Sequence, residues 1–374
     1  MDLSAVPVLD HHAHGLMRPG LLLRAPYAGF FTEARDPRQI ASHVPHTFSY
    51  GRCLMDVAEL LGVEPNEDAI AERREAMGID AYARTFFTAA QIEAVFLDDG
   101  FAQDQLAPVG WHERFFATAR ILRLEAHAEA ILARSTDLGQ FVELFRASLD
   151  PPPSGVVAFK SIAAYRTGLD VRLPARPDAE AGFREYKMGG GRLAQKALVD
   201  HILGVALEVA ARHGLPVQFH TGFGDPDLDL RLASPLHLRA ILEDERFRGV
   251  PLVLLHASYP FAREAGYLAA TYAHVYLDVG LAIPLLSVSG MERAMAQLLE
   301  LGPASKVLYS SDAHHVPELF YLAARRGRAA LGRVLDGAIR DGDLTAREAE
   351  RVARGVLRDN AALVYRWPAH DAAA

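Results

Sequence analysis

Cysteine is almost absent from this sequence. Cys53 is the only cysteine among 374 residues, so no disulfide can form within the chain and no metal site can be built from several thiolates. Long apolar runs are also missing, because none approaches the roughly 18 residues that are needed to span a bilayer. The first residues lack the basic segment of a secretion signal. We therefore expect a cytoplasmic protein without a membrane partner.

An excess of positive charge is missing as well. The 39 Lys and Arg residues are outnumbered by 47 Asp and Glu, which leaves a formal net charge of −8. A protein that binds nucleic acid needs cations to neutralise phosphates, and the basic stretch 325–328 is short and is typical of the solvated face of a helix. The composition thus argues against a nucleic-acid partner and favours a small-molecule substrate.

No glycine-rich nucleotide-binding loop follows the first apolar segment, although short apolar segments alternate with longer amphipathic ones. The segment 194–212, for example, has apolar residues at helical spacing. Eight βα units favour a closed (β/α)₈ TIM barrel of the α/β class over an open sheet. The eight predicted strands are Val6–Asp10, Ala94–Asp98, Ile121–Glu125, Val156–Ser161, Pro216–His220, Pro251–His256, Val275–Gly280 and Lys306–Ser310.

Two long connections interrupt this alternation. A large insertion of helix and loop, 15–91, follows the first strand and includes a predicted helix over 67–77, and a second long connection covers 163–193. Loops of this length on a barrel rim form lids or substrate walls, and the first could also make the contact of a homo-oligomer. No linker divides the chain, so we expect a single domain over 1–374, with a frayed end at 371–374.

The histidine-rich stretch 10–14 directly follows the first predicted strand. In an extended chain His12 and His14 project to the same side, since side chains alternate with a period of two. Two neutral imidazoles at such a position can bind one divalent ion. A histidine-rich turn without a metal is the alternative.

Polar groups follow three further apolar segments. His220 and His256 end the fifth and sixth predicted strands, and Asp312 follows the eighth. One such residue would more often be a satisfied core residue, but together with His12 and His14 they predict a common site at the mouth of the barrel. Nitrogen and carboxylate ligands favour Zn²⁺, with Mn²⁺ or Fe²⁺ as alternatives, and one or two ions per chain are compatible with the set.

Lys160 lies inside the apolar fourth strand, where lysine is rare unless it is paired or modified. Three interpretations remain open. The lysine can be carbamylated and bridge two metal ions, its ammonium can bind a substrate carboxylate, or it can extend its head group to the rim.

Further candidates surround the predicted mouth. Arg166 can bind a substrate carboxylate through its planar guanidinium, or it can form a salt bridge on the rim. Tyr165 and His315 are candidates for substrate contact. The remaining polar residues near strand ends could orient a ligand or form structural salt bridges, and they are Asp98, Asp99, Arg123, Glu125 and His314.

The order of the H-x-H pair, lysine, two histidines and aspartate resembles the amidohydrolase superfamily. Longer motifs resemble the amidohydrolase-related branch whose module is fused to a glutamine-synthetase-like domain in some plants and fungi. Here we expect the module to stand alone. The similarity extends from residue 6 to about residue 328 and rests on Phe159–Leu169, Phe219–Asp225, Leu255–Pro260 and Ser310–His314.

The resemblance implies that His12, His14, His220 and Asp312 bind metal, that His256 is a second-metal ligand or a catalytic residue, and that Lys160 matches the bridging lysine. Asp312 is then both a ligand and the general base. We expect hydrolysis of a C–N bond other than a peptide bond, in a small amide of γ-glutamyl or N-acyl type that carries a carboxylate. Non-oxidative decarboxylation with one metal and a catalytically silent binding module are the alternatives.

Overall fold

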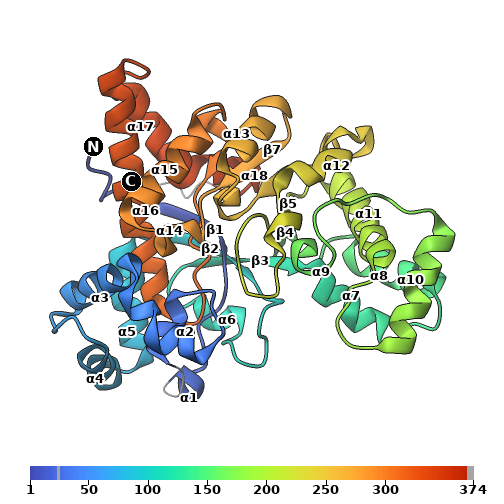
Figure 1. Cartoon of the computed structure of the whole chain (residues 1–374), viewed down its shortest axis with the longest axis horizontal. Coiled ribbons are helices and arrows are strands. Elements are labelled where there is room, and N and C mark those ends of the chain that lie inside the picture. Colours follow the sequence, from blue (N-terminus) through green and yellow to red (C-terminus); the bar gives the residue numbers. More distant parts are fainter. Residues whose placement is uncertain (23–25, 369–374) are drawn as a thin grey trace.

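The computed structural model describes residues 1–22 and 26–368 and contains one sheet of eight parallel strands. The strands follow each other around the sheet in chain order (Figure 1). Short hydrogen-bonded connections join the last strand to the first, where His14 N donates to Ala313 O at 2.8 Å and Asp312 N donates to His12 O at 3.0 Å. The fold is a nearly closed (β/α)₈ TIM barrel, as predicted. The strands are β1 Val8–Ala13, β2 Ile92–Asp98, β3 Ala117–Arg123, β4 Val156–Ser161, β5 Val217–Phe219, β6 Leu252–Leu254, β7 Val275–Asp278 and β8 Val307–Leu308.

Helices connect and surround the strands (Figure 1). The α-helices are α1 Pro19–Leu22, α2 Pro37–Ser42, α3 Phe48–Leu61, α4 Glu67–Met77, α5 Ile79–Ala90, α6 Val109–His112, α7 Leu124–Leu132, α8 Leu138–Leu149, α9 Ala163–Arg166, α10 Arg176–Gly189, α11 Lys196–His213, α12 Arg239–Glu243, α13 Ala262–Thr271, α14 Ala282–Leu285, α15 Val288–Leu299, α16 Pro317–Asp341, α17 Ala346–Arg354 and α18 Asn360–Val364. Short 3₁₀ turns are η1 Tyr27–Phe31, η2 Val44–His46, η3 Leu230–Leu232, η4 Pro235–Leu238, η5 Glu245–Phe247, η6 His256–Ser258 and η7 Ala304–Lys306, and a π-helical turn, η8, covers Gly355–Asp359. Among the described residues, no helix combines the length and apolar character that crossing a membrane requires.

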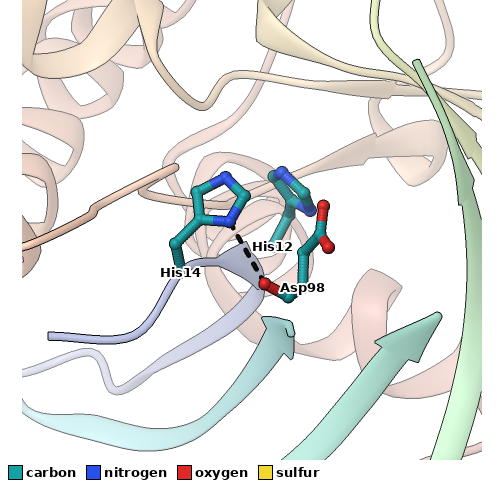
Figure 2. Close-up of side chains that lie close together, drawn as sticks. All are labelled: His12, His14 and Asp98. Atoms are coloured by element: carbon teal, nitrogen blue, oxygen red, sulfur yellow. Dashed lines mark hydrogen bonds between the residues drawn. The ribbon is translucent and has the colours of Figure 1, made fainter. Parts of the chain in front are cut away.

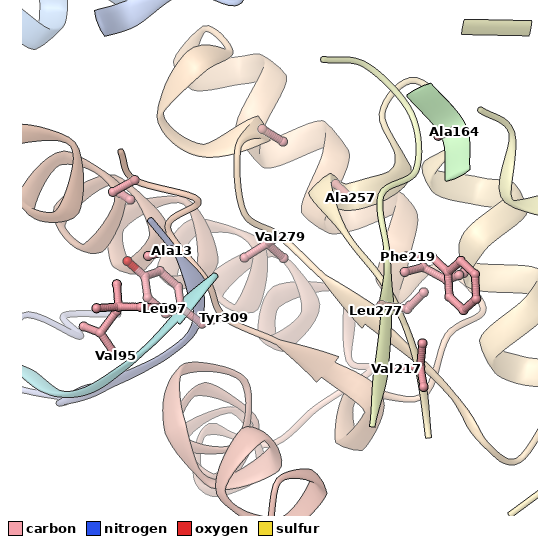
Figure 3. Packing of buried hydrophobic residues seen from close by; sticks show 14 of the residues in the cluster. Ala13, Val95, Leu97, Ala164, Val217, Phe219, Ala257, Leu277, Val279 and Tyr309 are labelled. Atoms are coloured by element: carbon pink, nitrogen blue, oxygen red, sulfur yellow. The ribbon is translucent and has the colours of Figure 1, made fainter. Parts of the chain in front are cut away.

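Alternation along the strands divides the apolar core into two clusters. In β2, Ala94 and Phe96 belong to the cluster inside the barrel, whereas Val95 and Leu97 belong to the larger cluster between the strands and the helices. Figure 3 shows residues of this outer cluster on several strands. The two clusters follow from the two-residue period of a strand that is buried on both faces.

The interior cluster is closed from one end by the C-terminal segment. Ala361, Val364 and Tyr365 pack with the inward-facing residues of the strands. The amide of Asn360 donates to the backbone oxygens of Ala304 and Val307, at the start of β8. α18 therefore covers the N-terminal ends of the strands and leaves their C-terminal ends open for a site.

The segment between β1 and β2 contains α1 to α5, and the predicted helix over 67–77 is confirmed as α4. α5 packs against α16 and α3 packs against α14, so the last helix of the segment joins the outer ring (Figure 1). The predicted helix over 194–212 corresponds to α11.

Strand bounds differ from prediction at two places that affect the site. β1 starts at Val8 and continues through His11 and His12 to Ala13, since Ala13 still pairs with Leu97 of β2. β3 lies over Ala117–Arg123, so that Glu125 belongs to α7 and not to the third strand. The predicted frayed end, 371–374, lies outside the described residues.

Candidate active site

The end of β1 brings two imidazoles to one carboxylate. Nε2 of His12 lies 3.1 Å from Oδ1 of Asp312, and Nε2 of His14 lies 3.3 Å from the same oxygen. Figure 2 shows His12 and His14 beside Asp98 at the end of β2, whose backbone oxygen lies 3.3 Å from Nδ1 of His14. Because β1 extends through Ala13, His12 lies within the strand and His14 directly follows it, where its backbone N donates to Ala313 O.

Asp312 reaches this position through an unusual backbone conformation after β8. Its φ is +50°, a left-handed value that is uncommon outside glycine. The buried carboxylate of Asp10 holds the preceding residue, because Oδ1 accepts from Ser311 N at 3.0 Å and Oδ2 accepts from the Ser311 hydroxyl. Asp10 therefore fixes the turn that places Asp312 beside the histidines.

His256 is held in a similar way after β6. Its φ is +67°, and its backbone N donates to Oδ2 of the buried Asp278 at 2.9 Å. Nδ1 of His256 lies 3.6 Å from Oδ2 of Asp312. The ring of His220 packs on His256 with centroids 4.4 Å apart, while Nε2 of His220 lies 3.1 Å from the backbone oxygen of Phe223.

Lys160 lies within this cluster and not at the rim. Its Nζ is 3.2 Å from Nε2 of His12, and the residue is only 2% exposed. Burial lowers the pKa of Lys160 to about 8, against the opposing charges of Asp98 and Asp312. A lysine with a lowered pKa more readily takes up the neutral form that carbamylation requires.

The cluster has the properties of a divalent cation site. Burial lowers the pKa of His12 to about 4 and also that of His256 well below its usual value, so both rings are neutral at neutral pH, as metal ligation requires. His12 Nδ1, His256 Nδ1 and Asp312 Oδ1 are buried without a well-formed hydrogen bond. Buried polar atoms of this kind are costly unless a partner is present, and nitrogen and carboxylate donors fit Zn²⁺.

In the described part of the chain, two sets of three side chains bring ligand atoms within 4.8 Å of one another: His12 with His14 and Asp98, and His12 with His256 and Asp312. The carboxylate of Asp98 is already bound by Arg123, whose Nη2 lies 2.6 Å from Oδ2. Among the described residues, no Lys or Arg lies within ion-pair distance of Asp312, whose near partners are His12, His14 and His256. The set that includes Asp312 is therefore the stronger candidate.

A cavity of about 570 Å³ opens above the cluster. Its floor contains Lys160, His220, His256 and Asp312. Its walls come from several loops, including the segment after η1 and the loop after β5. The charged residues of these walls are Glu33, Arg35, Arg123, Arg166, Arg192, Asp225 and Asp227.

A family model described as Amidohydrolase matches residues 179–367, which is half of the chain. The chain belongs to the amidohydrolase family. It is also 31% identical to protein fluG of Emericella nidulans over 402 aligned positions, which cover 96% of this chain and 45% of fluG. The chain thus spans less than half the length of that curated relative.

Solved structures agree with the family assignment. A protein from Lactobacillus casei ATCC 334, provisionally described as a metal-dependent hydrolase, is 30% identical with a TM-score of 0.88, and the match covers 98% of this chain and 97% of the other. Uronate isomerase from Thermotoga maritima has a TM-score of 0.69 at 13% identity, with 97% and 95% covered. The second likeness shows the fold alone.

The remaining predicted residues line the cavity of this amidohydrolase barrel or its edge. Arg166 lines the cavity and also pairs with Glu129, with Nη2 and Oε1 3.2 Å apart. The hydroxyl of Tyr165 accepts from the backbone N of Asp225 at 3.2 Å. His315 packs against Phe30, and its Nδ1 lies 2.8 Å from Nδ1 of His314.

Other candidate residues from the sequence form salt bridges or hydrogen bonds with neighbouring protein groups. Asp99 pairs with Arg120 at 2.7 Å. Glu125 accepts from Ser161 Oγ at 2.7 Å and from Ile162 N at 3.0 Å, which fixes the end of β4 next to Lys160. These contacts are structural.

Sequence reasoning missed several polar residues around the site. Asp10 and Asp278 are buried carboxylates that hold the backbone beneath Asp312 and His256. Asp10 stands in the histidine-rich stretch and Asp278 ends a strand, so both carried a detectable pattern. Glu33 and Arg192 lie in irregular segments, where no periodicity or motif marks them.

Proposed function

We propose that this amidohydrolase is a metal-dependent hydrolase that cleaves an amide C–N bond in a small, carboxylate-bearing substrate of γ-glutamyl or N-acyl type. The observation that carries the proposal is the convergence of imidazole nitrogens and one Asp312 oxygen within 3.3 Å, beneath a cavity lined by arginines. A cluster of neutral histidines and a carboxylate suits a Lewis-acid metal, and the cavity suits a ligand with negative charge.

The ligands in this proposal are His12, His14, His256 and Asp312, with His220 and Lys160 beside them. Zn²⁺ is the preferred ion, and Mn²⁺ or Fe²⁺ also fit these donors. A bound divalent ion supplies a water with a pKa lowered towards about 7 and polarises the substrate carbonyl. A carbamylated Lys160 would be a further ligand and would allow the site to bind two ions.

Asp312 carries the proton transfer in this scheme. Its second oxygen, Oδ2, lies 3.6 Å from Nδ1 of His256, and the residue lines the cavity. The carboxylate accepts the proton of the attacking water and delivers it to the leaving nitrogen. His256 either binds the metal or stabilises the oxygen that gains negative charge in the transition state.

The cavity wall supplies substrate binding. Arg166 and Arg192 border the space above Lys160, and planar guanidinium groups suit a carboxylate. Tyr165 and His315 complete the proposed substrate contacts. Truncation of Arg166 to alanine should raise KM for carboxylate-bearing amides, because its guanidinium lines the cavity and suits a carboxylate.

The deciding experiment joins metal analysis with a substrate screen. Protein purified without chelators is analysed for bound metal and assayed against γ-glutamyl and N-acyl amides, before and after metal removal. We expect bound Zn²⁺ and hydrolysis that metal removal abolishes. One ion, an unmodified Lys160 and release of carbon dioxide from a carboxylate substrate would instead establish decarboxylation. Metal-free protein without any turnover would favour a binding module.

A further inference from the structure

The charged residues of the cavity are not evenly distributed. Arg166 experiences the charges of two acidic residues, Glu129 and Glu125, and of two basic ones, Arg192 and Arg123. Glu33 experiences the negative charges of Asp312 and Asp225 and the positive charge of Arg35. Glu33, Arg192 and Asp225 lie in irregular segments, whereas Asp312 follows β8 and Arg166 lies in α9. Acidic and basic groups are therefore mixed around Arg166, whereas carboxylates outnumber cations around Glu33.

Glu33 differs from the other carboxylates that line the cavity. Asp225 pairs with Arg35 at 2.7 Å, Asp227 pairs with Arg192, and Asp312 lies among the histidines. Within residues 1–22 and 26–368, no Lys, Arg or His lies within ion-pair distance of Glu33. A cation that approaches from the cavity therefore finds an acceptor at this position.

The surroundings of Glu33 disfavour an isolated negative charge. Burial, followed by the charges of Asp312 and Asp225, raises the pKa of its carboxyl to about 8, against the opposing charge of Arg35. Two outcomes are open to such a group, protonation or a compensating positive charge. A ligand ammonium supplies the second, because it offers three donors and a full charge to the carboxylate.

We propose that Glu33 binds an ammonium group of the substrate. The acyl part of the cleaved amide therefore carries a free α-ammonium and a free α-carboxylate, and this carboxylate faces Arg166 and Arg192. This inference rests on the proposed function and makes it more specific. An amide of γ-glutamyl type keeps its α-ammonium, whereas an N-acyl amino acid has lost it. Glu33 thus selects the first of the two substrate types.

Matched ligands test this inference without turnover. Isothermal titration of the metal-loaded protein compares glutamate with glutarate and aspartate with succinate, since each pair differs only by the ammonium group. Carboxylate contacts are common to both members of a pair, so the ratio of the two Kd values isolates the ammonium. We expect the amino acid to bind about tenfold more tightly in at least one pair.

Variants assign the preference to Glu33. Glu33→Gln keeps the shape and removes the charge, and it should bring the ratio of Kd values close to one. Glu64→Gln, an exposed glutamate in the same insertion, should leave the ratio unchanged. Equal Kd values within both pairs of ligands, or an unchanged ratio in Glu33→Gln, would overturn the inference. Failure of the proposed function would appear separately, as absence of hydrolysis across the amide screen.

Discussion

The floor and the wall of the cavity are built by different parts of the molecule. At the floor, His12 lies inside β1 and the turns that carry His256 and Asp312 are fixed by buried carboxylates. At the wall, Glu33 and Arg35 come from irregular chain, and the contact between Arg35 and Asp225 joins half-exposed side chains. The floor is rigid because strands and buried hydrogen bonds define it, whereas the wall depends on how loops dock.

This difference predicts a division of roles. Groups held by strands and buried bonds suit chemistry, since proton transfer and metal ligation depend on atomic positions to a fraction of an ångström. Loop residues suit substrate selection, because loops vary without disturbing the barrel. Substitutions in the floor should therefore act on kcat and metal content, and substitutions in the wall should act on KM.

The largest expected effect is at the floor, in Asp312→Asn. The amide keeps the size of the side chain but cannot accept the water proton, so kcat should fall by about a thousandfold. Circular dichroism and the urea midpoint should remain close to those of the parent, which separates chemistry from folding. Turnover near the parental level would remove Asp312 from the mechanism and would end the distinction between floor and wall.

Gly224→Ala tests whether the wall can disturb the floor. An added Cβ would lie 2.9 Å from Nε2 of His220 and would overlap the hydroxyl of Tyr165, so one of the two rings has to move. We expect kcat/KM to fall by about a hundredfold, the loss typical of an active-site displacement of about 1 Å. Gly249→Ala is the control, because no heavy atom lies within 4 Å of its added Cβ. Equal activity in both variants would contradict the tight packing at Gly224.

The contrast also explains what the sequence could predict. Apolar segments of the right length gave all eight strands, and polar residues at their ends gave the floor, because parallel strands bring their C-terminal ends to one edge. The exception is informative. His220 follows β5 as expected, but its Nε2 lies at the backbone oxygen of Phe223, and such ring orientations depend on turn geometry that no spacing rule contains.

The wall could not be predicted in the same way. Arg35 and Asp225 are 190 positions apart in the chain, and Arg192 meets Asp227 from a segment without periodicity. Such pairs form only after the insertion docks on the barrel. The role of Arg166 could not be decided from the sequence either. The sequence left substrate binding and a rim salt bridge as alternatives, whereas the folded residue both pairs with Glu129 and lines the cavity.

His112 provides a pH test of how the wall is attached. Its Nε2 accepts from Leu16 N at 2.9 Å and its Nδ1 donates to Pro108 O at 3.1 Å, so the neutral ring ties the start of the insertion to the loop after β2. Burial lowers the pKa of His112 to about 4, from an ordinary value near 6.5. Between these values the unfolded chain binds more protons, so this stabilisation is present above pH 6.5 and is lost on acidification.

The variant His112→Gln should therefore flatten the dependence of stability on pH. Between pH 7 and pH 4.5, the free energy of unfolding of the parent should fall by about 2 kcal/mol more than that of the variant. Urea unfolding at the two pH values measures both differences, and the comparison cancels groups that titrate alike in the two proteins. An equal fall in the free energy of unfolding of the two proteins would show that protonation of His112 does not weaken the attachment of the insertion.

The smallest expected effect is that of Tyr365→Phe, beneath the floor of the cavity. Its hydroxyl lies 3.0 Å from Nδ1 of His11 and accepts from Gln218 Nε2 at 2.8 Å. Nε2 of His11 in turn lies 3.1 Å from Oδ1 of Asp278. The other oxygen of Asp278 accepts from the backbone N of His256. Tyr365→Phe should cost about 1 kcal/mol of stability, the contribution of a typical buried hydrogen bond. Because the same bonds position His256, kcat should also fall severalfold with KM unchanged, whereas Tyr267→Phe at an exposed position should change neither. If Tyr365→Phe loses stability but keeps the parental kcat, the C-terminal segment stabilises the barrel without positioning His256. The floor would then be fixed by its strands alone.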